Sequence, residues 1–369
     1  MDEHGTSAEA GHGEMLAVRY TGGEGDAGIR AAREARPAVG PGEVLVRVAA
    51  AGLNRADLMQ RAGVYPPPSG ASEIPGLEVS GTVVEVGPAA GLPGEGRFAV
   101  GDEVCALLAG GGYAEYVAVP AGQLMAVPDG VDLVDAAALP EVACTVWSTM
   151  FERGGVRAGD VVLVHGGSGG IGSFAVQYLA AIGARVLSTA GGPQKCERVR
   201  ALGAEDVFDH RAAEPGAFAE WVLERTGGRG ADVILDVVGG PYLDANVRCL
   251  AEEGRIVVIA AQGGVKAEGF NLMRLVAKRG WLTGATLRSR PVVEKARIVA
   301  GTESAVSPLV AAGRIDLSVA ARFPLAEAAA AQEWFDHAAR AGKVLLVTDA
   351  ADADRAPGEP GDGAAEARA

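Results

Sequence analysis

The stretch Val161–Gly192, VVLVHGGSGGIGSFAVQYLAAIGARVLSTAGG, decides the fold of this chain. It begins with Val161–Val164, a short apolar run of mostly β-branched residues that is typical of a parallel strand buried on both faces. Ser173–Ile182 carries apolar residues at helical intervals, and Ala184–Thr189 reads as a second strand. Strand, turn, helix and strand follow one another within about 30 residues, which predicts a βαβ unit.

Three glycines in the turn, Gly167, Gly169 and Gly172, keep the G-x-G-x-x-G spacing of a dinucleotide-binding site. The first glycine permits a tight turn, and the second leaves no Cβ between backbone N–H groups and a pyrophosphate. The third lets the helix lie close to the strand, so that its positive end faces the phosphates. An ordinary glycine-rich loop is the weaker interpretation, because the surrounding elements arrive in the required order.

The end of the second strand indicates which dinucleotide is bound. An NAD-selective site places an acidic residue about 20 residues beyond the glycines, yet none occurs from Ser173 to Cys196. The strand ends instead in hydroxyl-bearing and small residues, with Lys195 just beyond them. We therefore predict NADPH, although Lys195 is also compatible with a solvated residue in the first turn of a helix.

The composition limits the class of protein. The chain has 369 residues, of which 49% are hydrophobic and 22% charged, values typical of a globular protein with two domains. Its net charge of −14 argues against a nucleic-acid partner. Without a stretch of transmembrane length or a signal-peptide pattern, and with four widely spaced cysteines, we expect no membrane partner and a cytoplasmic protein with free thiols.

The chain divides into a β-rich part and a part with alternating strands and helices. We expect disordered tails at residues 1–13 and 348–369, a β-rich domain formed by residues 14–136 and 301–347, and a doubly wound parallel sheet within residues 137–300. The strands expected in the β-rich domain are Met15–Tyr20, Glu43–Ala51, Gly81–Val86, Glu103–Leu108, Ala114–Pro120 and Lys343–Val347. A helix is expected between Phe323 and the last of these strands.

Several long segments carry a specific resemblance. They are Ala50–Gly81, Gly101–Pro120, Ala136–Trp147, Val161–Gly172 and Gly342–Val347. Through them the chain resembles the zinc-free quinone oxidoreductases of the medium-chain dehydrogenase/reductase superfamily, and most closely their tumour-suppressor-inducible branch. The resemblance covers about Met15 to Val347 and implies an α/β protein with a GroES-like catalytic domain and a Rossmann nucleotide-binding domain.

The residues argue against a zinc site. Zinc-dependent relatives carry a Cys in the loop after the early strand and a Gly-His-Glu triplet, whereas this chain has Asn54 and then Gly76, Leu77 and Glu78. Four scattered cysteines also fail to make a structural four-thiolate site. We expect no zinc, and therefore no oxidation of alcohols through a metal-bound alkoxide.

The resemblance implies an active site formed by Asn54, Asp57 and Tyr65. Asn54 is expected to donate its amide to the acceptor or to the nicotinamide. Asp57 is expected to orient Asn54 or Arg55, with a helix-capping carboxylate as the equal alternative. Tyr65 stands in a Gly-x-Tyr-Pro context and is expected to stack on a flat ring and donate its hydroxyl.

The resemblance also implies the contacts to the cofactor. Thr145 is expected to approach the nicotinamide or its phosphates. The phosphate turn comprises Gly167, Ser168, Gly169, Gly170, Ile171 and Gly172. Thr189, Lys195, His210 and Arg211 are expected at the 2′-phosphate. Gln194 and His210 replace a Lys and a Tyr of relatives, which weakens the predicted preference for NADPH.

Three functions remain open at this point. The first is a zinc-free NADPH-dependent quinone reductase, and the second is a reductase of α,β-unsaturated carbonyl compounds, which needs the same site. The third is a cofactor-binding protein with a structural or RNA-binding role, against which the acidic balance argues. Edge strands of the nucleotide-binding sheet and the resemblance both favour a homodimer.

Overall fold

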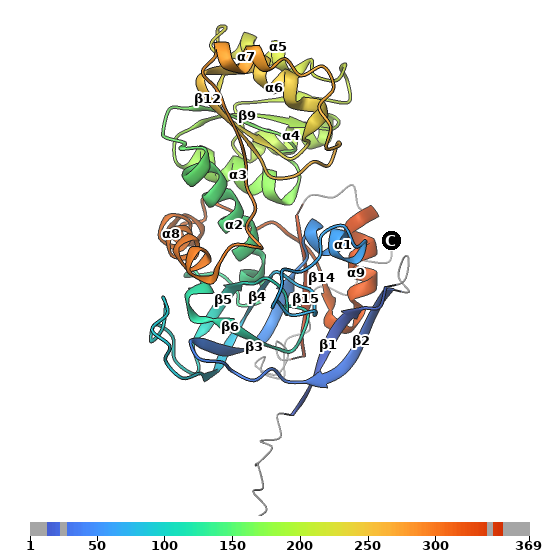
Figure 1. Ribbon diagram of the computed structural model, residues 1–369, viewed down its shortest axis with the longest axis vertical. Coiled ribbons are helices and arrows are strands. Elements are labelled where there is room, and N and C mark those ends of the chain that lie inside the picture. Colours follow the sequence, from blue (N-terminus) through green and yellow to red (C-terminus); the bar gives the residue numbers. More distant parts are fainter. Residues whose placement is uncertain (1–12, 23–27, 338–341, 350–369) are drawn as a thin grey trace, which may run out of the picture.

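The computed structural model describes residues 13–22, 28–337 and 342–349, and Figure 1 shows two sheet-based units joined by two helices. The upper unit contains the sequence from β8 to β13, and the lower unit contains both the start and the end of the described chain. The joining helices are α2 (Pro140–Trp147) and α8 (Val292–Ala311), which pack against each other.

The upper unit is a six-stranded sheet in which every neighbouring pair is parallel. Its strands are β8 (Val161–Val164), β9 (Arg185–Ala190), β10 (Asp206–Asp209), β11 (Ala231–Asp236), β12 (Leu250–Val258) and β13 (Trp281–Gly284). Their order is β10-β9-β8-β11-β12-β13, the order of the doubly wound dinucleotide-binding fold. All four residues of β8 are buried, which explains the wholly apolar sequence of this central strand.

Helices cover the parallel sheet. They are α3 (Gly170–Ala181), α4 (Pro193–Ala201), α5 (Phe218–Arg225), α6 (Leu243–Cys249) and α7 (Leu272–Ala277). Eight consecutive residues of α3, Gly172–Leu179, are buried. The helix therefore lies inside the unit, where it fixes the position of the glycine-rich turn before it.

The lower unit is built on a seven-stranded, mostly antiparallel sheet. Its strands are β3 (Glu43–Gly52), β4 (Glu78–Val86), β5 (Glu103–Leu107), β6 (Tyr116–Pro120), β7 (Leu124–Ala126), β14 (Val319–Pro324) and β15 (Lys343–Val347). The last two strands pair in parallel, and β15 joins β3. A hairpin of β1 (Glu14–Tyr20) and β2 (Ile29–Ala35) adds a second, two-stranded sheet.

Short helices complete the lower unit and the connections. α1 (Arg55–Arg61) follows β3, and α9 (Ala328–His337) lies between β14 and β15. The 3₁₀ segments are η2 (Ala121–Gln123), η3 (Asp135–Ala138), η5 (Gly240–Tyr242) and η6 (Leu325–Glu327), and η4 (Ser148–Arg153) is a π-helical continuation of α2. α2 also packs on α3, β4 and β5, so it contacts both units.

The predicted fold class is confirmed, with local corrections. Four elements, α1, β2, β7 and β14, are additional to those expected from the sequence. Thr348, which was expected in a tail, is buried and donates its backbone N–H to Ala49 O at 3.0 Å. α8 runs without a break through the expected boundary between residues 300 and 301. Residues 1–12 and 350–369 of the expected tails lie outside the described part of the chain.

The four cysteines are buried free thiols, as expected. Within the described residues, no helix combines the length and the apolar character needed to cross a membrane.

Candidate active site

The glycine-rich turn packs so closely that side chains are excluded from it. A Cβ on Gly172 would lie 2.1 Å from Gly166 O, and one on Gly167 would lie 2.2 Å from Ser188 Oγ. Both distances are far below van der Waals contact, so glycine is required at both positions. Gly169 and Gly170 are exposed where α3 begins, and the N–H groups of this first turn have no intrahelical acceptor. These features fit a dinucleotide pyrophosphate.

A buried series of hydrogen bonds supports the turn from below. Asn246 donates to Asp236 Oδ2 at 3.0 Å, so its Oδ1 accepts from His165 Nε2 at 2.7 Å. Burial lowers the pKa of His165, which leaves its Nδ1 to accept from Thr189 Oγ1 at 3.2 Å. Thr189 Oγ1 in turn accepts the N–H of Gly166 at 3.2 Å.

This series of hydrogen bonds changes the role expected for Thr189. The residue is 1% exposed, and both its hydroxyl hydrogen and its oxygen are occupied by His165 and Gly166. The expected direct contact with a 2′-phosphate does not match this position. Thr189 instead holds the first part of the glycine-rich turn.

Cationic side chains gather beyond the end of β9. A Cβ on Gly191 would lie 3.0 Å from both His210 Nε2 and Arg211 Nε, so these two side chains converge on the strand end. Lys195 lies in the first turn of α4 and is half-buried. The backbone N–H groups of Gly192 and Arg211 hold the pKa of the neighbouring Asp209 below its usual range. The strand end therefore carries positive groups beside one hydrogen-bonded carboxylate.

The remaining predicted cofactor residues lie within the turn and on α2. Ser168 and Ile171 are half-buried on either side of the exposed Gly169 and Gly170. Thr145 lies on α2, half-buried within a helix whose neighbouring residues Ala143, Cys144 and Val146 are buried. Thr145 therefore faces the accessible side of the helix that joins the two units.

In the lower unit, Asn54 belongs to a buried polar cluster with Glu78 and Lys343. Asn54 Nδ2 donates to Glu78 Oε1 at 2.8 Å and to Gly52 O at 3.3 Å, and Lys343 Nζ donates to Asn54 Oδ1 at 2.8 Å. Lys343 also forms an ion pair with Glu78. Because an ammonium donates and a carboxylate accepts, the amide orientation is fixed.

This cluster changes the role expected for Asn54. Its amide hydrogens are directed to Glu78 and to the backbone of β3, so they are not available to an acceptor. Asn54 instead links the lysine and the carboxylate and carries the start of α1.

Asp57 is buried behind Asn54. Its Oδ2 accepts the backbone N–H of Asn54 at 2.7 Å and the hydroxyl of Tyr113 at 2.9 Å. Burial raises the pKa of Asp57 to about 6, although both hydrogen bonds oppose the shift. Arg55, the other expected partner, pairs instead with Asp336. Asp57 thus orients Asn54 and caps α1, the two alternatives that the sequence left open.

Tyr65 lies apart from this cluster, on a loop held by Arg288. The guanidinium carbon of Arg288 is 5.4 Å from the centre of the Tyr65 ring, and its Nη1 donates to Tyr65 O at 3.3 Å. Arg288 also donates to Gln60 Oε1 at 2.6 Å and to Ala109 O at 2.9 Å. One side chain from beyond β13 thereby fixes the Tyr65 loop and the segment after β5.

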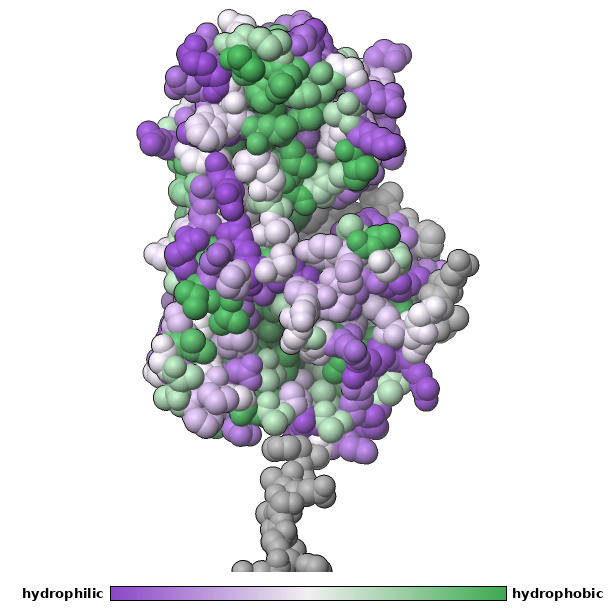
Figure 2. Space-filling view, in the orientation of Figure 1, coloured by the Kyte–Doolittle hydropathy of each residue, from purple (hydrophilic) through white to green (hydrophobic). Residues whose placement is uncertain are grey.

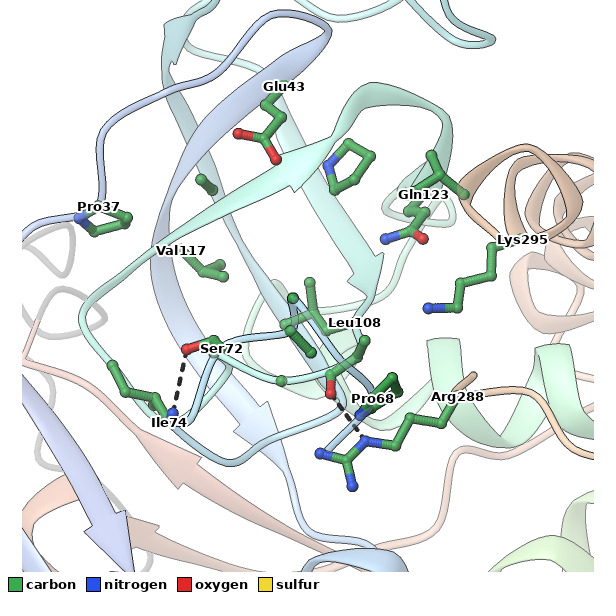
Figure 3. A pocket seen from close by; sticks show the side chains of 18 of the residues that line it. Pro37, Glu43, Pro68, Ser72, Ile74, Leu108, Val117, Gln123, Arg288 and Lys295 are labelled. Carbon is green, nitrogen blue, oxygen red and sulfur yellow. Dashed lines mark hydrogen bonds between the residues drawn. The ribbon is translucent and has the colours of Figure 1, made fainter. Parts of the chain in front are cut away.

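Arg288 also borders a cavity of about 660 Å³ in the lower unit. Figure 3 shows Arg288 and Lys295 reaching toward it from one side, opposite Ser72, Ile74 and Val117. Its lining contains none of Asn54, Tyr65, Glu78 or Thr145. The cavity is therefore separate from the polar cluster and from the accessible face of α2.

Sequence reasoning missed several residues of the site. One feature of the sequence could have indicated Lys343, because it is a cation at the start of an otherwise apolar strand. Arg288, Tyr113, His165 and Glu141 had no such signal, because their partners are distant in sequence; the Arg288–Gln60 contact spans 228 residues. Within the described residues, no group of three or more His, Cys, Asp or Glu side chains is placed to hold a metal ion.

Two family models match the two units. The alcohol dehydrogenase GroES-like domain matches residues 40–129, and the zinc-binding dehydrogenase matches residues 170–299. The first covers the lower sheet from β3 to β7, and the second runs from the start of α3 through the parallel sheet into α8.

Curated relatives include proteins of very different length. Phthioceranic/hydroxyphthioceranic acid synthase of Mycobacterium bovis (strain BCG / Pasteur 1173P2) is 34% identical over 83% of this chain, which spans 14% of the synthase. The 2-haloacrylate reductase of a Burkholderia species is 33% identical over 84% of this chain and 92% of its own length. The second match covers most of both chains.

Solved structures agree with these sequence matches. A mycobacterial quinone oxidoreductase superposes with a TM-score of 0.80 at 29% identity, over 91% of this chain and 100% of that one. A mycobacterial protein solved in complex with NADPH superposes with a TM-score of 0.78 at 30% identity. The match covers 90% of this chain and 99% of that one. Because both domain models and near-full-length relatives match, this chain belongs to the medium-chain dehydrogenase/reductase superfamily.

Proposed function

We propose that the protein is a zinc-independent NADPH:quinone oxidoreductase. The observation that carries this proposal is the arrangement around α2, which lies between a glycine cradle for a dinucleotide and a buried polar cluster in the lower unit. When bound, NADPH supplies the hydride that reduces the acceptor. The family supports oxidoreduction, and a quinone oxidoreductase is among the structures most similar to this one.

We propose that the chain holds NADPH at the carboxyl end of β9, where the glycine-rich turn and the cationic side chains both lie. The turn from Gly167 to Gly172 would bind the pyrophosphate through backbone N–H groups. Lys195, His210 and Arg211 would bind the 2′-phosphate, because charge-assisted hydrogen bonds favour a dianion at this strand end. Thr145 would face the nicotinamide from α2.

In the lower unit, we propose different tasks for the predicted residues. Tyr65, held against Arg288, would stack on a flat acceptor and donate its hydroxyl. Asn54 and Asp57 would position the start of α1 and the Glu78–Lys343 pair rather than contact the acceptor. No residue at these positions supplies the Cys or His ligands of a catalytic zinc, which supports a zinc-free reaction.

The finer assignments are also part of this proposal. Placement in the tumour-suppressor-inducible branch is supported by the segments Ala50–Gly81 and Ala136–Trp147. A cytoplasmic location is supported by four free thiols.

Reduction of α,β-unsaturated carbonyl compounds is the second candidate. It is favoured by the near-full-length match to 2-haloacrylate reductase, whose named substrate is an α,β-unsaturated acid. Hydride would then reach a β-carbon, and the same site would stabilise the resulting enolate. A structural or RNA-binding role is the weakest candidate, because the net charge is −14.

Purified protein is expected to oxidise NADPH in the presence of benzoquinones or naphthoquinones and to be indifferent to chelators. We expect NADPH to exceed NADH in kcat/KM by about tenfold or more, since a single charge-assisted hydrogen bond contributes about 1.5–3 kcal/mol. Absorbance at the NADPH band, measured with a panel of quinones and 2-alkenals, gives both results.

The panel separates the candidates. Turnover of alkenals without turnover of quinones would move the function to enone reduction. A rate that falls with chelator and returns with zinc would contradict the zinc-free mechanism. NADPH binding without turnover of any acceptor would favour a non-catalytic role.

We further propose a homodimer formed through the outer edge of the parallel sheet. β13 is an edge strand with Trp281 63% exposed, and the adjacent α7 exposes Leu272, Met273 and Val276. Figure 2 shows hydrophobic side chains gathered on this face of the upper unit. An unpaired edge beside an apolar surface favours pairing with a second copy.

Light scattering at micromolar concentration is expected to give the mass of two chains. The double variant Trp281→Lys/Leu282→Lys is expected to give one chain, because buried charges at a dimer interface are unfavourable. Val64→Lys, which changes an exposed residue of the other unit, is the matched control and should stay dimeric. A single-chain mass for the unmodified protein would contradict the proposal.

A further inference from the structure

Glu141 lies on the accessible face of α2, the helix that joins the two units. It precedes Thr145 by one helical turn, so both side chains lie on the same face of the helix. Both are half-buried, whereas Val142, Ala143 and Cys144 between them are buried. Glu141 therefore faces the same side as the residue proposed to approach the nicotinamide.

Glu141 is also joined to the polar cluster of the lower unit. Its backbone N–H donates to Glu78 Oε2 at 2.9 Å, and Glu78 is bound by Asn54 and Lys343 through its other oxygen. The charged groups that act on Glu141 come from four elements: Glu78 of β4, Lys343 of β15, Asp57 of α1 and Lys295 of α8. Arg288 also acts on it, from the segment that precedes α8. The backbone of Glu141 is thus bound to the cluster, while its side chain lies on the same face of α2 as Thr145.

One oxygen of the carboxyl group has no hydrogen-bond partner. Its Oε2 is enclosed and makes no hydrogen bond among the described residues. Burial, followed by the nearby Glu78 carboxylate, raises the pKa of Glu141 to about 8, and the lysines only partly oppose this shift. Burial therefore favours the protonated acid, and Oε2 has no internal hydrogen-bond partner among the described residues.

We propose that Glu141 is the acid that protonates the acceptor after hydride has been added. This inference rests on the proposed function, because quinones and enones alike need one proton for each hydride. The Glu141 O–H bond breaks, its electron pair stays on the carboxylate, and a new O–H or C–H bond forms on the reduced acceptor. Water then returns a proton to the carboxylate.

Glu141→Gln keeps the shape of the side chain and removes the proton. We expect kcat to fall about 100-fold or more, as for loss of a general acid, while the dissociation constant of NADPH changes by less than about threefold because the phosphate contacts remain. In the unmodified protein, kcat should fall about tenfold per pH unit above pH 8, since the acid form is lost as the pH rises through the pKa. In Glu141→Gln this fall of kcat above pH 8 should be absent.

A second readout does not depend on turnover. Carbon NMR of protein labelled at glutamate carboxyls, without cofactor, should show one signal titrating near pH 8 that is missing in Glu141→Gln. Glu141→Asp provides a second variant that keeps the acid with a shorter reach, and we expect a rate between the other two. Glu224→Gln, at an exposed position of α5, is the matched control and should behave as the unmodified protein.

The outcomes are distinct. Suppose that the unmodified protein reduces acceptors and that Glu141→Gln keeps both the same kcat and the same fall of kcat above pH 8. The role of Glu141 is then overturned and the proposed function stands. If all glutamate signals titrate near their ordinary pKa, the role is also overturned. If the unmodified protein reduces no acceptor, the proposed function and this role fail together.

Discussion

Gly172→Ala is expected to abolish measurable NADPH binding. The new Cβ would lie 2.1 Å from Gly166 O, 2.7 Å from Gly166 C and 2.8 Å from Gly167 Cα, all backbone atoms that no side-chain movement can clear. The start of α3 would have to move away from the turn, and its N–H groups would move with it. Loss of two hydrogen bonds to a charged phosphate, each contributing about 1.5–3 kcal/mol, corresponds to at least about 100-fold weaker binding.

Gly172→Ala is also expected to destabilise the folded protein. Overpacking of a close contact destabilises a protein by about 1–3 kcal/mol, so the melting temperature should fall together with NADPH affinity. NADPH fluorescence titration and thermal unfolding measure the two effects. Gly284→Ala is the matched control, since a Cβ there would meet only Val258 O, at 3.9 Å. Tight NADPH binding by Gly172→Ala would show that the turn does not hold the pyrophosphate.

The same local crowding explains why this part of the fold could be predicted. The requirement for Gly172 arises from Gly166 and Gly167, five or six residues away, and the buried β8 carries its apolar pattern in four consecutive residues. Interactions of this range leave a readable pattern in the sequence. The hairpin strand β2 left none: its sequence, IRAAREA, combines alanines with charged residues, and none of its residues is buried.

The candidate site was predictable only where its contacts are short-range. Asn54 and Asp57 lie three residues apart, and their pairing was foreseen. The contact from Lys343 to Asn54 spans 289 residues, so nothing in the local sequence indicates that the amide is already occupied. The hydrogen bonds of Thr189 were hidden for a similar reason, because the His165–Asn246 contact that orients its partner spans 81 residues. Resemblance identified these positions, and packing determined what their side chains do.

Lys343→Met is expected to destabilise the folded protein by about 3–5 kcal/mol, the range found when one member of a buried ion pair is removed. Glu78 is 0% exposed and Lys343 is 5% exposed, so water cannot replace the lost ammonium. Methionine fills a similar volume, which confines the change to charge and hydrogen bonding. Urea unfolding followed by circular dichroism measures the free energy. Arg185→Met, which breaks the exposed pair with Glu205, should cost less than about 1 kcal/mol.

The double variant Lys343→Met/Glu78→Gln tests whether the loss comes from the stranded charge. The neutral amide that replaces the Glu78 carboxylate can accept the N–H of Glu141 and donate to Asn54 once the Asn54 amide rotates, so no buried charge is left unpaired. We expect the double variant to recover about 2 kcal/mol or more of the loss. If the losses of stability in the single variants Lys343→Met and Glu78→Gln simply add in the double variant, the ion pair contributes little to holding β15 against β4. Lys343 would then stabilise the strand through its packing.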